Sequence, residues 1–202
     1  MNLNFIFVYL PYNFIVMNNF LDSKFEELHH LIIKEGKRDG KIEKQQLEIL
    51  KTVLGKIKSY YGKKVEIDYT RFNTKQHENW YRIDQDGIIK KGDYRNCGNK
   101  WYDSKTFDAI IDITIGNKEY SLFFVLKSAQ VAGGTQDYAI KEIGQYSKSM
   151  QKNTDENLHF IFILDGEYIN SDIDKLDKSN NYEVCTSETL ENTLKSFINS
   201  KI

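Results

Sequence analysis

The sequence predicts an α/β fold with a mixed central sheet flanked by helices, and three observations predict it. Two β-rich runs, 106–115 and 120–127, are separated by a short segment that contains Gly and Asn, which is typical of an antiparallel hairpin. A helical pattern follows at 136–150, and the continuous apolar run 158–164 then indicates a strand buried on both faces. A right-handed crossover through the helix would place this strand beside the second strand of the hairpin.

The composition is that of a single globular domain. At 202 residues and 23.7 kDa the chain is long enough for a full-sized core, and 40% apolar with 28% charged residues argue against disorder. Because the formal net charge is −1, any DNA contact would come from a local basic patch rather than from the whole surface. Cys97 and Cys185 lack the spacing of a structural zinc site, and they do not indicate a disulfide framework.

The N-terminal stretch is apolar but does not have the features of a membrane or secretion segment. Residues 5–16 are too few to span a bilayer, they include Pro11, and they lack a basic leading region and a cleavage site. We expect residues 1–16 to be a non-native extension and Met17 to open the functional chain; the alternative is an extra docked strand. Residues 17–202 would then form one domain, and the cytoplasm is the expected compartment.

Residues 17–64 are expected to form an N-terminal helical region. Apolar residues recur at three- and four-residue steps between Asn18 and about Tyr61, and the segment 36–40 divides them into two helices. The second helix has a lysine-rich face, which indicates either a solvated surface or one that contacts phosphates or forms a dimer. The lysines are Lys44, Lys51, Lys56, Lys58, Lys63 and Lys64.

The segment 65–105 predicts one strand, at 65–69, and no other clear element. The remainder mixes aromatic and basic side chains, among them Arg82 and Arg95. Such mixing suits a surface that packs partly on the core and partly on a nucleic-acid backbone, and plain packing at a sheet edge is the alternative. Arg95 is the residue of this segment that we expect at DNA.

The expected register of the hairpin follows from a four-residue connection. If Ile115 lies opposite Tyr120, Asp108 lies opposite Lys127. Alternation would then place an apolar set on the core face and present Asp108 and Lys127 together on the other face. The expected core-face set is Phe107, Ala109, Ile111, Ile113, Leu122, Phe124 and Leu126.

The C-terminal part completes the α/β pattern. Residues 182–186 indicate a further short strand, and Thr186 or Ser187 is expected to cap a last helix. Thr135 is the expected cap of the helix at 136–150. The order is hairpin, crossover helix, buried strand, short strand and helix.

Two segments of this region resemble a known family. TFDAII contains Asp108, and FFVLKSAQVAGGTQD contains Lys127 followed by a polar loop that glycines interrupt. From about Thr106 to the C-terminus, this layout resembles the PD-(D/E)xK nuclease superfamily, and within it the type II restriction endonucleases. The resemblance implies a restriction endonuclease-like catalytic core at 106–202, Mg²⁺-dependent and sequence-specific hydrolysis of double-stranded DNA, a homodimer, and a cognate DNA methyltransferase.

The resemblance also implies roles for single residues. Asp108 and the backbone carbonyl of Leu126 would bind the metal, and Lys127 would position or deprotonate the attacking water. The acid that the family has two residues before the lysine falls on Val125, so the motif here is V-x-K.

Three explanations of the missing acid stay open. The carboxylate has moved, with Glu142 as the candidate catalytic and metal-binding residue and Asp112 as a weaker one. It has been lost, which leaves an inactive or weakened copy. Or the fold binds DNA and never cuts it. The plainest interpretation of Asp108 and Lys127 is a cross-strand ion pair of little energetic value in a small α/β interaction module.

The loop after Lys127 supplies the other expected DNA contacts. Its glycines would let the backbone approach a phosphate, and its hydroxyl and carboxamide side chains suit the edges of bases. We expect four residues of this region to face DNA: Gln130, Thr135, Gln136 and Asp137. Tyr146, on the helix that follows, is expected in the core.

Overall fold

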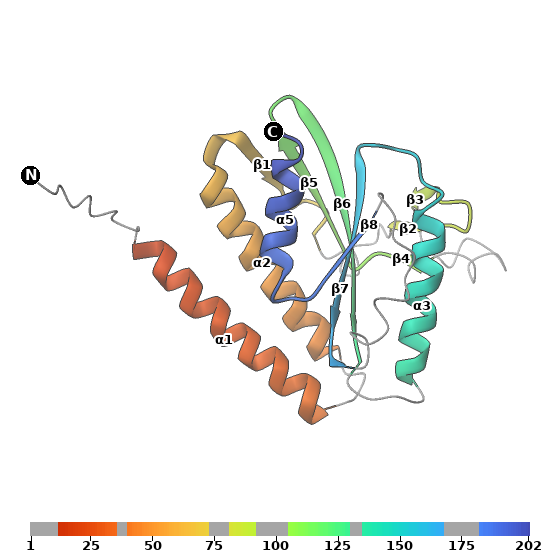
Figure 1. Cartoon of the computed structure of the whole chain (residues 1–202), viewed down its shortest axis with the longest axis horizontal. Helices are drawn as coiled ribbons and strands as arrows, with labels where there is room; N and C mark the ends of the chain where they lie inside the picture. The colour runs from red at the N-terminus through yellow and green to blue at the C-terminus, as the bar shows by residue number, and fades with distance from the viewer. Residues whose placement is uncertain (1–11, 36–39, 73–80, 92–104, 130–134, 168–181) are drawn as a thin grey trace, which may run out of the picture.

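The computed structural model describes residues 12–35, 40–72, 81–91, 105–129, 135–167 and 182–202 (Figure 1). The helices are α1 (Tyr12–Glu35), α2 (Lys41–Tyr61), the 3₁₀ turn η1 (Gly62–Lys64), α3 (Thr135–Met150) and α5 (Leu190–Asn199). The strands are β1 (Val65–Asp68), β2 (Tyr81–Ile83), β3 (Ile89–Lys91), β4 (Lys105–Thr106), β5 (Ala109–Ile115), β6 (Lys118–Ser128), β7 (Leu158–Asp165) and β8 (Tyr182–Cys185).

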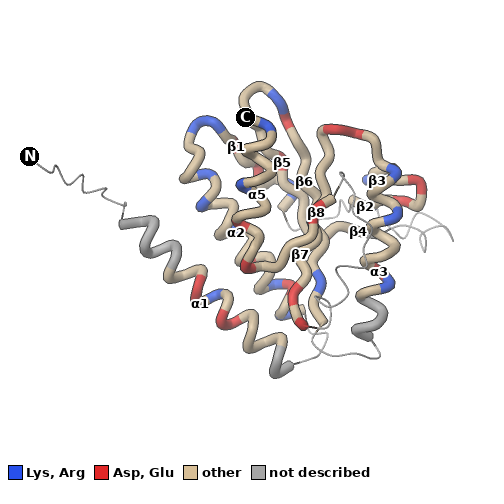
Figure 2. Tube along the Cα trace, viewed as in Figure 1, with Lys and Arg blue, Asp and Glu red and all other residues tan. Residues whose placement is uncertain are grey.

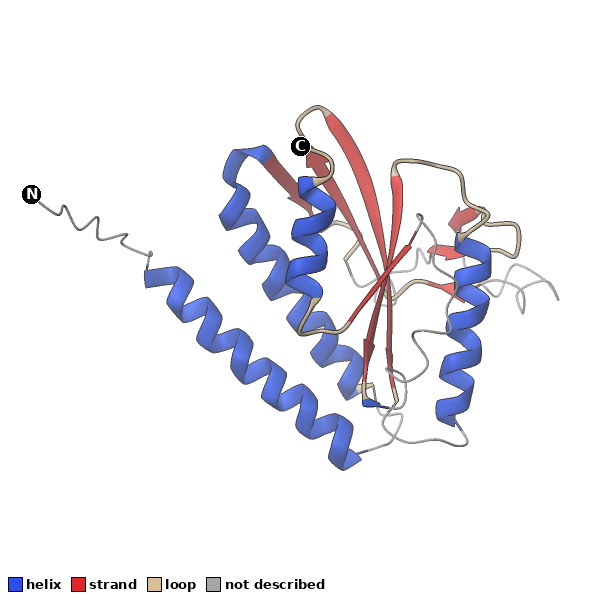
Figure 3. Cartoon of the chain, in the orientation of Figure 1, coloured by secondary structure: helices blue, strands red, loops and turns tan. Residues whose placement is uncertain are grey.

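A five-stranded mixed sheet forms the centre of the molecule (Figure 3). Its strand order is β1-β5-β6-β7-β8; β5 is antiparallel to both β1 and β6, whereas β6, β7 and β8 run parallel. Helices α2 and α5 cover one face, with α1 packed against α2, and α3 covers the other face. The predicted α/β class, the mixed sheet flanked by helices and the N-terminal helical region are confirmed.

Both faces of the central sheet are buried. Six of the seven predicted core-face residues pack on the α2 side, namely Ala109, Ile111, Ile113, Leu122, Phe124 and Leu126. On the α3 side, Ile110, Phe123 and Val125 form a second core with residues of α3 and β7. Phe107 belongs to this second core and not, as predicted, to the first, because the chain bends at residues 107 and 108 between β4 and β5.

The register of the hairpin differs from the predicted one by two residues. Ile115 pairs with Lys118, so the connection is a two-residue turn and not a four-residue one. Two-residue turns match the twist of antiparallel strands, and Gly116 adopts the positive φ, 62°, that such turns need. The shift keeps every side chain on its face, but continuing the register beyond the Ala109–Phe124 pair puts Val125, and not Lys127, opposite Asp108.

A second sheet of three short strands, in the order β3-β2-β4, lies in the segment where the sequence predicts only the strand at 65–69. Its residue Ile83 is buried in the core on the α3 side. The side chain of Asn153 donates a hydrogen bond of 2.8 Å to the carbonyl of Gly87, which ties the β2–β3 turn to the end of α3. Strands of two or three residues carry too few alternations for a sequence pattern to identify them.

The other predicted elements are confirmed with small changes of their ends. The strand predicted at 65–69 is β1, the helix predicted at 136–150 is α3, and the later strands are β7 and β8. The predicted cap of the last helix is wrong: Thr189 is the N-cap residue of α5, and its side chain makes no capping hydrogen bond. Thr186 lies in the preceding turn, where its Oγ1 accepts a hydrogen bond of 3.3 Å from the N–H of Thr189. Ser187, the alternative cap, instead binds Asp165.

The N-terminal helix α1 begins at Tyr12, so the boundary expected at Met17 falls inside one continuous helix. The start of the functional chain at Met17 stays a prediction. In the described ranges, no helix is both long and apolar enough to cross a membrane.

Glu191 joins α5 to α2. Its carboxylate binds the ammonium groups of Lys56 on α2 and of Lys195, one turn further along α5. Burial raises the pKa of Glu191, but the hydrogen bonds and charges of Lys195 and Lys56 outweigh burial and hold this pKa below its ordinary value. A carboxylate whose pKa is lower in the folded state stabilises the fold above its unfolded pKa, and this contribution is lost as pH falls through the folded pKa.

We therefore expect Glu191→Gln to lower the free energy of unfolding at neutral pH by about 1 kcal/mol or less, because the ion pairs are partly exposed. The variant should also lose less stability than the wild type below pH 4.5, the ordinary pKa of this group. Urea unfolding at neutral and acidic pH measures both effects. Glu188→Gln, which changes an exposed carboxylate nearby, is the control, and equal effects of the two variants would contradict the role of Glu191.

Candidate active site

The candidate groups lie at one edge of the central sheet. The parallel strands β6 and β7 end side by side at Ser128 and Asp165, and β5 starts at this edge because it runs antiparallel to β6. In α/β proteins, ligands bind outside the carboxyl ends of parallel strands. Figure 2 shows acidic and basic segments close together at this end of the sheet.

Asp108 is buried, with 2% of its surface exposed. It lies in the bend between β4 and β5, and its Oδ2 accepts a hydrogen bond of 2.7 Å from the N–H of Leu126. Its own N–H donates to the carbonyl of Phe124 at 2.9 Å. The carboxylate thus replaces a backbone acceptor at the point where the β5–β6 ladder ends. This position differs from the predicted one on an open face directly opposite Lys127.

Lys127 contacts an acid on α3 and not an acid on β5. Its Nζ lies 2.9 Å from Oε2 of Glu142, and 22% and 23% of the two side chains are exposed. The structure therefore brings Glu142 of α3 to Lys127, and the transfer of the acid to the helix stays a prediction. The pair lies at the surface of the site, and Asp108 lies deeper.

Tyr146, one turn of α3 after Glu142, shows that the two carboxylates share one neighbourhood. Burial raises the pKa of Tyr146 well above its ordinary value, and the negative charges of Asp108 and Glu142 raise it further. The neutral hydroxyl donates a hydrogen bond to the carbonyl of Thr106, which immediately precedes the bend at Phe107 and Asp108. Tyr146 is a core residue, as expected, and it holds α3 against this bend.

Val125 occupies the position at which the PD-(D/E)xK motif would have its second acid. It follows Phe124, which pairs with Ala109 in the last pair of the β5–β6 ladder; it is 0% exposed, and it packs in the core beneath α3 with Ile143 and Tyr146. A side chain that fills this core position cannot bind a metal. The acid that pairs with Lys127 comes instead from α3, as Glu142.

No family model, curated protein or solved structure matches this chain. What the site can do must therefore be inferred from its own side chains. The likeness to restriction endonucleases rests on the motif and on the order of the elements.

A second buried network lies beside the site, and the sequence did not predict it. Oδ2 of Asp165 accepts hydrogen bonds from Gln46 Nε2 at 2.7 Å and from the hydroxyl of Ser187 at 2.6 Å, and Oδ1 accepts one from the Ser187 N–H at 2.9 Å. Gln46 also donates to the backbone carbonyl of Lys127 at 3.2 Å. The network fixes the backbone of Lys127 relative to α2, β7 and the turn before α5.

One sequence signal could have indicated this network. Asp165 is the polar residue that ends the buried strand, and Gly166 follows it with a φ of 106°. A Cβ at Gly166 would lie 2.4 Å from the carbonyl oxygen of Ala129, so the chain needs glycine there. Gln46, in contrast, is one polar residue among the apolar positions of a helix, and no local pattern indicates its partner.

The oxygen atoms of the site suit Mg²⁺ bound together with a substrate. In the described ranges, no three His, Cys, Asp or Glu residues lie close enough together to hold a metal ion. Mg²⁺, however, is usually held by one or two carboxylates, and waters and substrate phosphates complete its shell. Asp108, Glu142 and the carbonyl of Leu126 are the candidate ligands of such a site.

Asp112, the weaker candidate for the moved acid, is bound elsewhere. Its Oδ2 accepts a hydrogen bond of 2.8 Å from Arg71 Nε, and its Oδ1 contacts Arg71 Nη2 and accepts one of 2.6 Å from the hydroxyl of Ser121. Its carboxylate therefore anchors the Arg71 segment to the hairpin and does not serve the site.

Most of the predicted DNA contacts lie outside the described residues. Gln130 and Arg95 fall in segments that are not described, and the same holds for the side chains of Thr135, Gln136 and Asp137 in the first turns of α3. Their contact with DNA stays a prediction.

Asp108→Ala should destabilise the fold independently of any activity. The substitution leaves the buried N–H of Leu126 without its acceptor, which we expect to lower the free energy of unfolding by about 1–3 kcal/mol. Asp108→Asn keeps an oxygen acceptor of similar size and should cost less. Urea unfolding of both variants measures the difference; an equal loss would show that the hydrogen bond to Leu126 is not what Asp108 contributes.

Proposed function

We propose that this chain hydrolyses phosphodiester bonds of double-stranded DNA as a Mg²⁺-dependent, restriction endonuclease-like enzyme. The observation that carries the proposal is the 2.9 Å contact between Lys127 Nζ and Glu142 Oε2, in the neighbourhood of Asp108. The order of hairpin, crossover helix and parallel strand supports it. Because an α/β sheet serves many functions, the side chains of the site carry more weight than the fold.

Asp108, Glu142 and the Leu126 carbonyl would hold the metal ion. In an antiparallel pair, the N–H and C=O of one residue point toward the same neighbouring strand, so the Leu126 N–H that binds Asp108 puts the Leu126 carbonyl on that side too. When bound, Mg²⁺ would neutralise phosphate charge and lower the pKa of a coordinated water.

Lys127 would stabilise the negative charge that develops on the phosphate and orient the attacking water. Its side chain is partly exposed, so a substrate can reach its ammonium group. A carboxylate has two oxygens, and Glu142 can therefore hold Lys127 through one of them and the ion through the other. The network of Gln46 and Asp165 keeps the backbone of Lys127 in place during these steps.

The proposed substrate is a short site in double-stranded DNA, cut by a homodimer whose twofold axis matches a palindrome. With a net charge of −1, the chain would bind DNA through local contacts. The proposed contacts are Gln130, Thr135, Gln136, Asp137 and Arg95. A cognate DNA methyltransferase is the expected companion of such an enzyme, and its cytoplasmic location would accompany this role.

A second candidate function is DNA binding by an inactive relative. Val125 favours it, because an apolar residue fills the place of an acid and is completely buried. The burial of Asp108 at 2% exposure favours it as well, since its carboxylate already serves the backbone of Leu126.

Plasmid DNA separates these candidates. We expect the wild type to cleave with Mg²⁺ and not with EDTA, and Asp108→Asn, Glu142→Gln and Lys127→Ala each to slow cleavage by about a hundredfold or more, as when a charge-stabilising group is lost. Gel analysis of the plasmid over time measures the rates. Glu156→Gln, which changes an exposed carboxylate in the turn before β7 at the far end of the strand, should leave the rate unchanged.

Each other result selects a different function. Metal-independent cleavage, or full activity of Asp108→Asn, would refute the proposed enzyme. A salt-dependent shift of DNA without cleavage would select the inactive binding protein. Neither cleavage nor a shift would select a small α/β interaction module.

Val125→Glu distinguishes a moved acid from a lost one. If the acid has been lost, the substitution should create or raise cleavage and Mg²⁺ should raise the melting temperature of the variant. If Glu142 has replaced it, a second buried carboxylate opposite Asp108 only adds repulsion and desolvation, and we expect a lower melting temperature with no gain in cleavage. Val125→Gln, similar in size but uncharged, is the control for overpacking.

A further inference from the structure

Arg82 on β2 is a buried cation, and two of its three guanidinium nitrogens have no hydrogen-bond partner among the described residues. Only 9% of its surface is exposed, and in the described part of the chain its Nε and Nη1 have no hydrogen-bond partner. Buried charges are normally paired, because an unpaired one loses its hydration without compensation. A guanidinium held in this state is therefore suited to an anion that comes from outside the chain.

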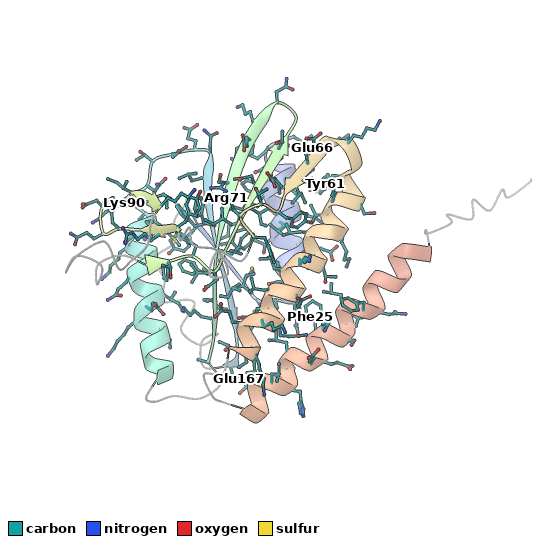
Figure 4. All side chains as sticks on the ribbon, turned by 180° about the vertical axis from the view of Figure 1, so that it is seen from behind. Phe25, Tyr61, Glu66, Arg71, Lys90 and Glu167 are labelled. Atoms are coloured by element: carbon teal, nitrogen blue, oxygen red, sulfur yellow. The ribbon has the colours of Figure 1, made fainter. Side chains whose placement is uncertain are left out.

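The surroundings of Arg82 add to its affinity for an anion. In the small sheet it lies opposite Lys90 on β3 and Thr106 on β4, and side chains of directly opposite residues share one face. Thr106 brings a hydroxyl group to this face, and Figure 4 shows Lys90 next to α3 and far from α1. The acid Asp84, two residues after Arg82, pairs with Lys90 at 2.5 Å.

The strand that pairs with Arg82 leads directly into the candidate active site. The partner Thr106 precedes Asp108 by two residues, which is roughly 7 Å at the rise of a strand. The N–H of Phe107 donates to the carbonyl of Tyr81 at 3.1 Å, so β2 stays attached to the chain right beside Asp108. A separation of this size spans one or two nucleotides of a DNA strand, whose rise along the duplex axis is about 3.4 Å each.

We propose that Arg82 binds a phosphate oxyanion of the DNA backbone, one or two nucleotides from the bond that is cut. The guanidinium fork matches two phosphate oxygens, which explains the presence of arginine and not lysine at this position. The choice of DNA as the source of the phosphate rests on the proposed function. Free phosphate has the same chemistry, and the experiment separates the two sources.

DNA binding in the absence of cleavage tests this site. Fluorescence anisotropy of a labelled duplex with the full chain in EDTA gives the slope of log affinity against log salt. We expect Arg82→Gln to reduce the magnitude of this slope by about 1, because one phosphate contact is lost. Arg82→Lys should keep the slope and bind more weakly, since an ammonium group cannot bind two oxygens in parallel. Lys118→Gln, at an exposed lysine where β6 begins, is the matched control and should change neither quantity.

A second measurement compares the melting temperatures of the wild type and of Arg82→Gln with and without inorganic phosphate. Stabilisation of the wild type but not of Arg82→Gln would support an oxyanion site open to free phosphate, and a changed slope without that stabilisation would assign the site to the DNA backbone. An unchanged slope together with equal phosphate stabilisation in Arg82→Gln would overturn the proposal. If Arg82→Gln does not fold, Arg82→Lys decides, and affinities equal to those of the wild type would overturn it.

These readouts do not require cleavage. Arg82-dependent binding in a protein that never cuts DNA would refute the proposed enzyme and leave the phosphate site standing. If the protein cleaves DNA but the salt dependence of its DNA affinity is the same with and without Arg82, the proposed enzyme stands and the phosphate site is refuted.

Discussion

The two-residue turn at Gly116 and Asn117 determines how the hairpin strands pair, and most features of the site follow from that pairing. With Ile115 opposite Lys118, β6 extends two residues further past the start of β5 than a four-residue connection would allow. Lys127 therefore lies beyond the last pair of the ladder, where α3 and not β5 supplies its partner, Glu142. Where β5 begins, the Asp108 carboxylate completes the ladder by binding the Leu126 N–H.

At this end of the sheet, two aspartates play the same part: the carboxylate of each accepts a hydrogen bond from a backbone N–H. Asp108 accepts the N–H of Leu126, and Asp165 accepts the N–H of Ser187. Lys127 lies between them along the edge, and its carbonyl is held by Gln46. The candidate catalytic groups are thus part of the hydrogen bonds that terminate the sheet, which gives them fixed positions before any ligand binds. The same arrangement limits them, because a buried carboxylate already engaged by the backbone has less freedom to bind a metal.

Local patterns predict much of this fold, and contacts between distant residues are what they leave out. The alternation that places Leu122 and Phe124 in the core survives a shift of two residues, so the faces of the hairpin are predicted although the register is not. Glu142 was expected at the site because the helix that carries it follows the motif strand directly. Gln46 and Asp165 are 119 positions apart in the sequence, and no local pattern around either residue indicates that they form a hydrogen bond. The small sheet is not predicted for a related reason. Its strands show no alternating pattern, and a contact with the end of α3, distant in the sequence, stabilises the turn between two of them.

The Asp165 network has a consequence for the dynamics of the C-terminal region. Ser187 lies in a turn, outside any helix or strand, and turn amides usually exchange with solvent quickly. Its N–H is nevertheless buried and held by a carboxylate that Gln46 of α2 also binds. Exchange of this amide requires the buried carboxylate of Asp165 to release it, so the turn before α5 should exchange more slowly than its local conformation alone would indicate.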